Sequence, residues 1–502
     1  MSGTEFLDVG HVYDVDADLR LPRLRRVPRV VGVLHAPVVD LVTTYFDTAD
    51  LALAHDGISL RRTGDRDPGW HLTLPVSRGG QSEIRRAADD PAEAPPTDLL
   101  DLVRAYVREH PVGQVLTLRT RRSAHHLRGP EARTLVDLWD DRVTAESWSD
   151  GAAAETWREW HLNPVAGDVA TLDEVGSLLT GAGAVRSGVP FTLARVLGPR
   201  LRTQDRPSAK RLRRGTASDV WSAYVARQVV LLKRADLRFR AADPAGSHRM
   251  RVAARRLRSC LSTYRDLLEP GAADRLCTEL KWLGQVLSGA RDAQVLTDRI
   301  TELVERQPPG LVRGPVLERL ATEKGTKLRR GRTAAVGELD GARYFRLLDD
   351  LDGLLAHPPY SSSARQPTES LKRALVEDLE RVRKRRRRVA AAGSPTERDL
   401  ALHDVRKSAK RLRYAAEVVR PTLGRDARRL SRRAKAVQQV LGEHQDSVVC
   451  RAALADIAHR AHLDGECTFT WGRLHALEDA RARSLERAYD DAVAALTSSP
   501  AR

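Results

Sequence analysis

Two short stretches of the sequence, residues 248–258 and 403–413, share one pattern of histidine and basic residues. Each begins with a histidine, and cationic side chains follow at offsets of 3, 7 and 10. These positions are His248, Arg251, Arg255 and Arg258 in the first stretch and His403, Arg406, Lys410 and Arg413 in the second. On an α-helix, at about 100° per residue, such offsets fall within roughly 80° of one another. Because arginine suits bidentate contact with phosphate oxygens, the pattern predicts two helices that bind a polyanion.

The opposite side of both predicted helices is apolar. Its residues are Met250, Ala253, Leu257 and Leu261 in the first helix and Val405, Leu412 and Ala416 in the second. An apolar stripe of this kind is the part of a helix that packs into a core. One side of each helix therefore anchors it, and the other presents a row of like charges whose repulsion a bound polyanion would relieve.

The duplication extends beyond the two basic helices. Residues 280–292 and 434–446 each have a lysine near the start and end in aspartate. The distance from the leading histidine to that aspartate is 44 positions in one copy and 43 in the other. A repeat of whole units at nearly constant spacing indicates an internal duplication.

Taken in order, these segments resemble the CHAD family, the conserved-histidine α-helical domains associated with inorganic polyphosphate. The resemblance covers about residues 216–495 and includes both histidine-led helices and both aspartate-containing segments. It implies two pseudo-symmetric helical bundles whose basic helices line a shared groove for a phosphate chain. The polyphosphate-binding residues that it implies are His248, Arg251, Arg255, Arg256, Arg258, Lys281, Arg291, His403, Arg406, Lys407, Lys410, Arg411, Arg413 and Lys435.

Positive charge belongs to the C-terminal part of the chain. The whole chain has 84 Lys and Arg against 67 Asp and Glu, a net charge of +17. Residues 1–200 have 23 Arg, no Lys and 29 acidic residues, so the remainder has a net charge of +23. Such a field attracts polyanions without selecting among them. Nucleic acid is therefore a rival ligand, opposed by an aromatic content of 5% and by the lack of a helix-turn-helix, zinc-finger or RNP pattern.

The first 200 residues have the pattern of a β-sheet. Alternating or β-rich segments, separated by Gly, Pro and Asp turns, recur at residues 41–46, 58–62, 70–74, 82–85, 115–121 and 134–138. We expect a largely antiparallel sheet that closes into a barrel. Charged residues at alternate positions, such as Glu83 with Arg85 and Arg119 with Arg121, would line one face of it as a polar lumen.

Residues 45–48, 60–62 and 70–75 resemble segments of the CYTH family, whose members are triphosphate-tunnel enzymes. The resemblance spans about residues 4–200. Family enzymes hold a divalent metal with paired glutamates and neutralise phosphate with lysines. Here Asp8 remains near the start, but several of the family's charged positions are lost. The replacing residues are Gly10, Val12, Thr73, His161, Asn163 and Thr192.

A tunnel without these groups is expected to hydrolyse triphosphate poorly or not at all, because metal-assisted cleavage needs hard oxygen ligands and cations at the phosphoryl oxygens. Other charged residues are retained, and they could bind an anion weakly or form cross-strand ion pairs that stabilise the sheet. The cationic ones are Arg61, Arg85, Arg119 and Arg121, and the residual carboxylates are Glu83, Asp137 and Glu159. We assign no catalytic residue and no metal ligand.

The chain is therefore expected to be an α+β multidomain protein. A degenerate CYTH-like antiparallel β-barrel of residues 4–198 is followed by a linker, 199–215, that mixes Pro, Gly, Ser and charge without periodicity. The all-α part has one helical repeat at 216–355 and a second at 370–495. Residues 356–369, with three prolines and three serines, separate the two repeats.

The function expected from these features is the binding of inorganic polyphosphate in the basic groove, beside a triphosphate tunnel without activity. One alternative is an active triphosphatase that uses Mg²⁺ or Mn²⁺, and another is a nucleic-acid-binding protein. Apart from that metal we expect no cofactor. No run of about 18 apolar residues predicts a membrane span, so we expect a cytoplasmic protein that associates with polyphosphate granules and not with a membrane.

Overall fold

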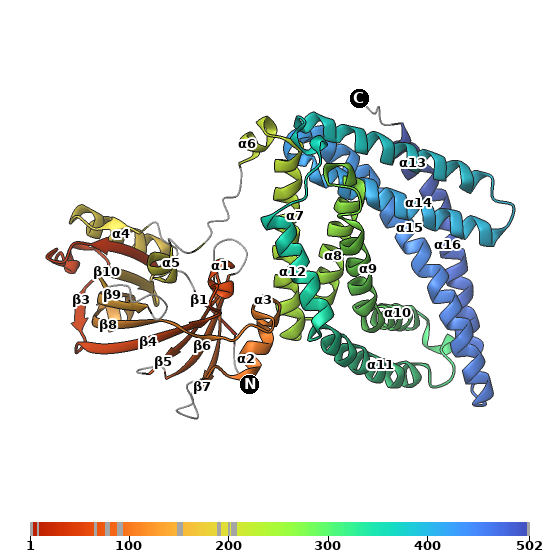
Figure 1. Ribbon diagram of the computed structural model, residues 1–502. Helices are drawn as coiled ribbons and strands as arrows, with labels where there is room; N and C mark the ends of the chain where they lie inside the picture. Colours follow the sequence, from red (N-terminus) through yellow and green to blue (C-terminus); the bar gives the residue numbers. More distant parts are fainter. Residues whose placement is uncertain are drawn as a thin grey trace. The chain divides into compact units, whose positions relative to one another are not determined.

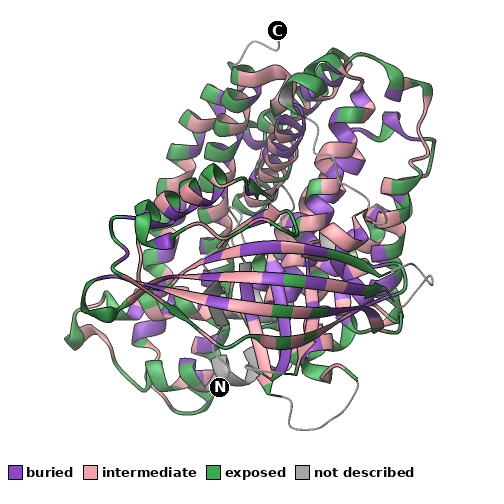
Figure 2. Ribbon diagram, turned by 90° about the vertical axis from the view of Figure 1, so that its left-hand side faces the viewer, coloured by how far each residue is buried: buried purple, intermediate pink, exposed green. Residues whose placement is uncertain are grey.

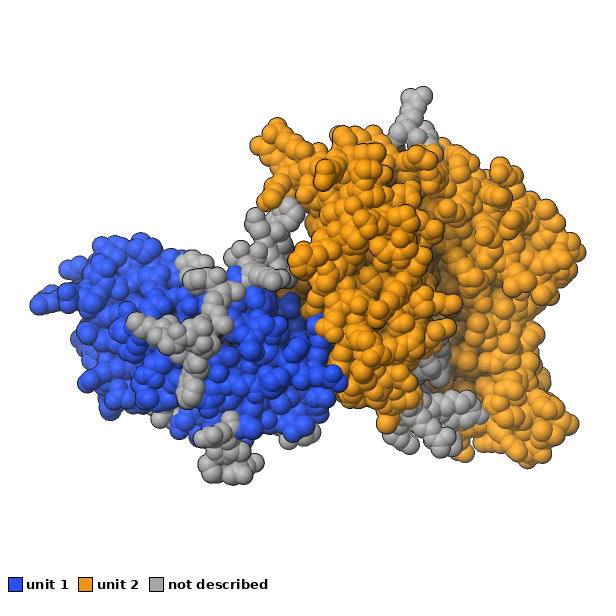
Figure 3. All heavy atoms as spheres, viewed as in Figure 1, with its two compact units in different colours: residues 1–205 blue, residues 206–502 orange. Residues whose placement is uncertain are grey.

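The structure is a computed structural model that describes residues 4–7, 10–64, 68–75, 81–87, 94–147, 154–187, 192–198, 201 and 208–498. The chain divides into two compact units, residues 1–205 and 206–502 (Figure 1, Figure 3). The first unit is built on strands and the second on helices. The boundary falls inside the expected linker, 199–215, where the structure adds a short helix, α6 (Ala209–Arg214).

The first unit is one antiparallel sheet in which every described strand pairing is antiparallel. The strand order is β1-β7-β6-β5-β4-β8-β9-β10-β2-β11, with β3 paired to β8. All six segments predicted as strands lie in this sheet. The strands are β1 (Thr4–Leu7), β2 (His11–Val15), β3 (Gly32–His35), β4 (Val39–Asp47), β5 (Ser59–Thr63), β6 (Gly69–Pro75), β7 (Gln81–Ala87), β8 (Gly113–Arg128), β9 (Thr134–Ser147), β10 (Glu155–Pro164) and β11 (Val185–Arg186).

We expected this sheet to close into a barrel, but the described strands at its two ends, β1 and β11, do not pair with each other. The path of paired strands is open, from β1 at one end to β11 at the other. However, β1 and β2 follow each other in the sequence, and they pair with different parts of the sheet. Strand β1 pairs with β7, and strand β2 pairs with β10. Four residue steps, from Leu7 to His11, span at most about 14 Å. The sheet must therefore curl until its β7 and β10 sides come near each other.

A hydrophobic core lies between one part of this sheet and α4 (Val169–Gly181). Tyr13 of β2 and Trp160 of β10 pack there with Leu172 and Val175 of α4, all nearly inaccessible to solvent. Asp168 caps this helix by accepting a hydrogen bond from the backbone N–H of Thr171 at 2.9 Å. The shorter helices of the unit are α1 (Ala52–His55), α2 (Thr97–Leu102), α3 (Arg104–Val107), α5 (Thr192–Leu197) and the 3-10 turns η1 (Leu24–Arg26) and η2 (Pro130–Ala132).

The second unit is a helical assembly in which neighbours in sequence pack together: α7 with α8, α8 with α9, α13 with α14, α14 with α15, and α15 with α16. Its helices are α7 (Ala217–Arg240), α8 (Gly246–Thr263), α9 (Asp274–Val286), α10 (Ser288–Glu305), α11 (Val316–Leu339), α12 (Ala342–Ala356), α13 (Lys372–Ala390), α14 (Pro395–Val418), α15 (Arg420–Leu463) and α16 (Phe469–Thr497). Its 3-10 turns are η3 (Arg265–Leu267), η4 (Pro309–Leu311), η5 (Ser362–Arg365) and η6 (Thr368–Leu371). Among the described helices, none has the length and apolar character needed to cross a membrane.

The two basic segments form α8 and α14, and their apolar sides lie in the core as predicted. Met250 and Leu257 of α8 and Val405 and Leu412 of α14 are fully buried. Buried and exposed positions follow one another along the helices of the second unit and the strands of the first (Figure 2). This amphipathic division is what holds both basic sides at fixed places on the second unit.

Candidate functional site

The equivalent helices of the two repeats, α8 and α14, pack against each other. Arg256 of α8 donates a hydrogen bond to Glu417 of α14 at 2.9 Å, and Arg411 of α14 donates to Ser262 of α8 at 3.0 Å. Arg411 lies 155 positions after Arg256, and Glu417 lies 155 positions after Ser262. Equivalent residues therefore make reciprocal contacts, which is the arrangement expected of a pseudo-twofold axis between the two helices.

This contact changes the interpretation of two arginines that were expected in the groove. Arg411 also bonds to Asp378 of α13 at 2.8 Å, and the side chain of Asp378 is 2% exposed. Removing either partner of such a buried pair leaves a charge without compensation. Arg256 and Arg411 are thus cross-links between helices, and both guanidinium groups already have carboxylate partners.

A different set of cations meets between the same two helices. Burial and the charges of four arginines, from both α8 and α14, lower the pKa of Lys410 to about 7. Charges act this strongly only over short distances. We call these five residues the basic cluster: Arg251 and Arg255 of α8 and Arg406, Lys410 and Arg413 of α14.

Three members of the basic cluster, Arg255, Arg406 and Lys410, are poorly neutralised. Among the described residues, the structure records no ion pair for Arg255 or Lys410, and the Nε atoms of Arg255 and Arg406 are buried without a hydrogen-bond partner. Burial and the charge of Arg255 also lower the pKa of Arg406, against an opposing effect of Asp446. Two like charges about 6 Å apart repel by about 3 kcal/mol at an effective dielectric constant of about 20. A bound anion would remove this repulsion and complete the unused hydrogen bonds.

Helix α15 borders the basic cluster on one side. Arg413 bonds to Gln438 of α15 at 2.8 Å and to Glu417 at 3.2 Å. Arg406 lies against Gly442, where an added Cβ would be 3.6 Å from its guanidinium. Burial lowers the pKa of His403, and a side-chain hydrogen bond with Gln445 opposes this effect in part. The sequence grouped only basic residues, and it missed these polar neighbours from α15.

The remaining residues of the predicted groove lie outside the basic cluster. His248, Lys281 and Lys435 are exposed on α8, α9 and α15, and the exposed Lys407 lies 3.6 Å from Asp404. Arg258 lies beside Cys277 of α9, on whose thiol its charge acts. The side chain of Arg291 is outside the described residues.

In the first unit, the retained carboxylates are paired with cations. Glu83 is 1% exposed and accepts hydrogen bonds from Arg61 at 2.5 Å and from Arg85 at 2.8 Å. Burial would raise its pKa, but His71 and these arginines lower it to about 2. Thr73, at the position of a family lysine, lies next to Glu83 and accepts a hydrogen bond from Arg61. Glu83 is therefore ionised and saturated by its neighbours.

A second group of carboxylates in the sheet, Glu159, Asp141 and Asp137, also has hydrogen-bonding or cationic partners. Glu159 accepts hydrogen bonds from Trp157 at 2.8 Å and shares one with His161 at 2.9 Å. Asp141, which the sequence did not single out, forms a two-pronged pair with Arg122 at 2.7 and 2.8 Å. Asp137 lies 2.7 Å from the ring of His126. Asp8 lies outside the described residues.

Strand register separates the four arginines that were expected together in the tunnel. Thr43 of β4 pairs with Thr63 of β5 and with Leu118 of β8, so Leu118 shares a face with Arg61. Because alternate residues of a strand point to opposite faces, Arg119 and Arg121 lie on the other face from Arg61 and Arg85. Both are exposed there. The enclosed, charged face of β8 has Arg122 instead.

The second unit is thus a duplicated helical domain with one basic cluster built from both copies. A model of the CHAD domain family matches residues 223–455. The uncharacterized proteins Rv2226 and MT2285 of two Mycobacterium tuberculosis strains are 36% identical to this chain over 493 residues, which cover 94% of this chain and 93% of each relative. The chain belongs to the CHAD-domain family.

Solved structures show weaker likeness. PptA from Streptomyces chartreusis is 21% identical, with a TM-score of 0.48, over 55% of this chain and 99% of that one. The CHAD domain of the plant Ricinus communis is 24% identical, with a TM-score of 0.44, over 58% of this chain and 94% of that one. A candidate adenylate cyclase from Bacillus halodurans is 14% identical, with a TM-score of 0.25, over 38% of this chain and 96% of that one. Likeness at this level supports no argument about ligands.

Proposed function

We propose that this protein binds inorganic polyphosphate at the basic cluster, between the equivalent helices of its two repeats. The observation behind the proposal is the partial burial of Arg255, Arg406 and Lys410 beside further arginines, with no ion pair recorded for these three among the described residues. A chain with a negative charge on every unit can neutralise several of them at once, which a single small anion cannot. Bidentate contacts with phosphate oxygens would engage Arg255 and Arg406, whose Nε atoms have no hydrogen-bond partner.

The length of the basic side of α14 also suits an extended ligand. His403, Arg406, Lys410 and Arg413 lie on one face, and the first and last are separated by about 15 Å along the helix axis at 1.5 Å per residue. A polymer could follow this line past Arg251 and Arg255 of α8. We place this binding in the cytoplasm and at polyphosphate granules, and it needs no cofactor.

Polyphosphate suits the cluster better than nucleic acid does. Proteins that bind single strands without sequence preference stack bases on exposed aromatic side chains. Tyr414, an aromatic residue next to the basic cluster, is 2% exposed and lies beneath the guanidinium groups of Arg256 and Arg413. Its ring is therefore covered, and the described cluster offers charge but no stacking surface there.

The test is a titration of the full chain with long-chain polyphosphate, tripolyphosphate and single-stranded DNA at two salt concentrations. We expect the long polymer to bind most tightly and to lose affinity steeply as salt rises, because each phosphate contact releases counterions. Equal or tighter binding of DNA at both salt concentrations would favour the nucleic-acid alternative. Binding of none of the three would refute the proposal.

A further inference from the structure

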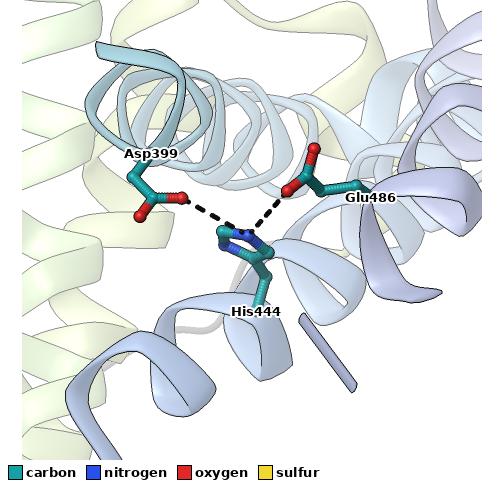
Figure 4. A group of neighbouring side chains, drawn as sticks. All are labelled: Asp399, His444 and Glu486. Atoms are coloured by element: carbon teal, nitrogen blue, oxygen red, sulfur yellow. Dashed lines mark ion pairs between the residues drawn. The ribbon is translucent and has the colours of Figure 1, made fainter. Parts of the chain in front are cut away.

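Three side chains that could hold a metal ion meet at the start of α14. Asp399 of α14, His444 of α15 and Glu486 of α16 each offer one ligand atom, and these atoms lie within 4.8 Å of one another (Figure 4). The Nε2 atom of His444 is 3.6 Å from an oxygen of Asp399 and 3.7 Å from an oxygen of Glu486. Figure 4 shows both carboxylates pointing toward the imidazole from different helices.

The two distances from the Nε2 atom of His444 suit a shared ion better than direct hydrogen bonds. A contact of 3.6 Å is too long for a hydrogen bond. Ligand atoms that each lie about 2.0–2.2 Å from one tetrahedral ion are separated by about 3.3–3.6 Å. The imidazole of His444 is 4% exposed, and the described residues give its Nε2 atom no closer polar partner. The Nε2 atom of this buried side chain faces two carboxylates without a hydrogen bond to either, so it can still act as a ligand.

The surroundings of the carboxylates match a metal site with an open side. Arg398 donates a hydrogen bond to Oε2 of Glu486 at 2.5 Å, while Oε1 faces His444. Outer contacts of this kind orient a ligating carboxylate. The side chains of Asp399 and Glu486 are 34% and 26% exposed, so solvent reaches the site from their side. Three protein ligands with an open position are typical of zinc sites that also bind water.

This triad belongs to the second repeat alone. Asp399 lies four positions before His403 and His444 two positions before Asp446, so their counterparts in the first repeat are Pro244 and Ala290. Neither counterpart can ligate a metal through its side chain. General packing of the duplicated helices therefore does not explain the triad, because the duplicated unit does without it at the equivalent place.

We infer that Asp399, His444 and Glu486 bind one divalent transition-metal ion, Zn²⁺ or Mn²⁺. An imidazole combined with two carboxylates suits these ions better than Mg²⁺, which prefers oxygen ligands only. The inference does not depend on the binding of polyphosphate. Asp399 nevertheless lies on the same face of α14 as His403 and Arg406, one turn beyond the basic side, so the ion would sit at the end of that line.

The experiment is a titration of the chelator-treated full chain with Zn²⁺, Mn²⁺ and Mg²⁺ in the absence of any phosphate. We expect one equivalent of Zn²⁺ or Mn²⁺ to bind, and the visible absorption of Co²⁺ to report the same site. Asp399→Asn and Glu486→Gln keep size and shape, and each should weaken this equivalent at least tenfold. His444→Ala should abolish it. The matched control is His459→Ala, which removes an exposed histidine from the same helix.

Folding is checked separately, since His444 is buried. Circular dichroism and thermal unfolding of Asp399→Asn should match the unmodified chain without metal, so a loss of metal binding in this variant reports the site itself. Equal metal stoichiometry and affinity in Asp399→Asn, His444→Ala and the unmodified chain would overturn the inference. So would the absence of any tightly bound equivalent of metal in the unmodified chain.

Discussion

Arg256 and Arg411 occupy equivalent positions in the two repeats, and each donates a hydrogen bond to the helix on which the other lies. This reciprocal contact joins α8 to α14 and brings their basic sides together. The cationic residues one position earlier along each helix, Arg255 and Lys410, then lie close enough for the charge of Arg255 to act on Lys410. The helix contact and the ligand site thus share the same two helices but use different residues.

Because helix contact and ligand binding use different residues, substitutions at Arg411 and Arg255 should affect stability differently. Among the described residues, Arg411→Ala leaves the buried Asp378 with Arg381 as its one cationic partner, beside a hydrogen bond from Thr263 at 3.5 Å, and should lower the free energy of unfolding by about 1–3 kcal/mol. Arg255→Ala removes a repelled charge and should leave stability unchanged or higher, while it weakens polyphosphate binding. Urea unfolding and polyphosphate titration of both variants check this. A stability loss in Arg255→Ala as large as that in Arg411→Ala would contradict the assignment.

The lowered pKa of Lys410 leads us to expect that polyphosphate binding depends on pH. Its pKa of about 7 in the free protein is low because of burial and four nearby arginines. A bound polyanion favours the charged form and raises this pKa, so binding takes up a proton above pH 7. The affinity is therefore full well below pH 7 and falls as the pH rises from 7 to the pKa of the bound state, by about tenfold for each unit by which binding raises this pKa.

The control for this pH dependence is Lys410→Arg. Arginine stays protonated throughout the range, so the variant should bind with nearly constant affinity from pH 6.5 to 9.5. The same polymer and ionic strength are used for both proteins, which cancels any titration of the phosphate ends. An identical fall in affinity in Lys410→Arg would show that Lys410 is not the titrating group.

We expect the first unit to show no metal-dependent hydrolysis of triphosphates. Glu83 and Glu159 are saturated by arginine, histidine and tryptophan partners, and Val12 and Thr73 supply no positive charge for a phosphoryl transition state. With Mg²⁺ or Mn²⁺, tripolyphosphate, ATP and thiamine triphosphate should release no phosphate above the blank. Turnover near 1 s⁻¹ that disappeared in Glu83→Gln would establish the triphosphatase alternative instead.

The sequence predicted the parts of the fold that depend on local periodicity. The apolar sides of α8 and α14 are buried as expected, because an amphipathic helix has only one face that can enter a core. The duplication was likewise visible in spacing alone. Arg256 and Arg411 were grouped with the phosphate ligands because they adjoin the basic side. Their partners, Glu417 and Ser262, belong to the other repeat, and no local pattern shows that contact.

In the first unit, too, the local pattern of a strand does not show its contacts with distant parts of the chain. Alternation correctly places Arg119 and Arg121 on one face of β8, but it does not say which face the sheet encloses. The pairing of Leu118 with Thr43 settles that question, and it depends on a strand about 75 positions away. The metal triad was missed for a similar reason. Asp399, His444 and Glu486 come from three helices and have no common spacing.

The central claim is that one polyanion site is built from both repeats, and the most direct measurement is polyphosphate affinity of matched charge-loss variants. Arg255→Ala and Arg406→Ala each remove one cation of the basic cluster, from α8 and α14 respectively. Arg306→Ala and Arg373→Ala each remove one exposed arginine that pairs with a glutamate four positions away in the sequence. We expect each cluster variant to lose at least tenfold in affinity and to show a flatter salt dependence, while each control stays within about twofold of the unmodified chain. Equal losses in all four variants would mean that only net charge matters, and an unaffected Arg255→Ala or Arg406→Ala would mean that its helix takes no part in the site.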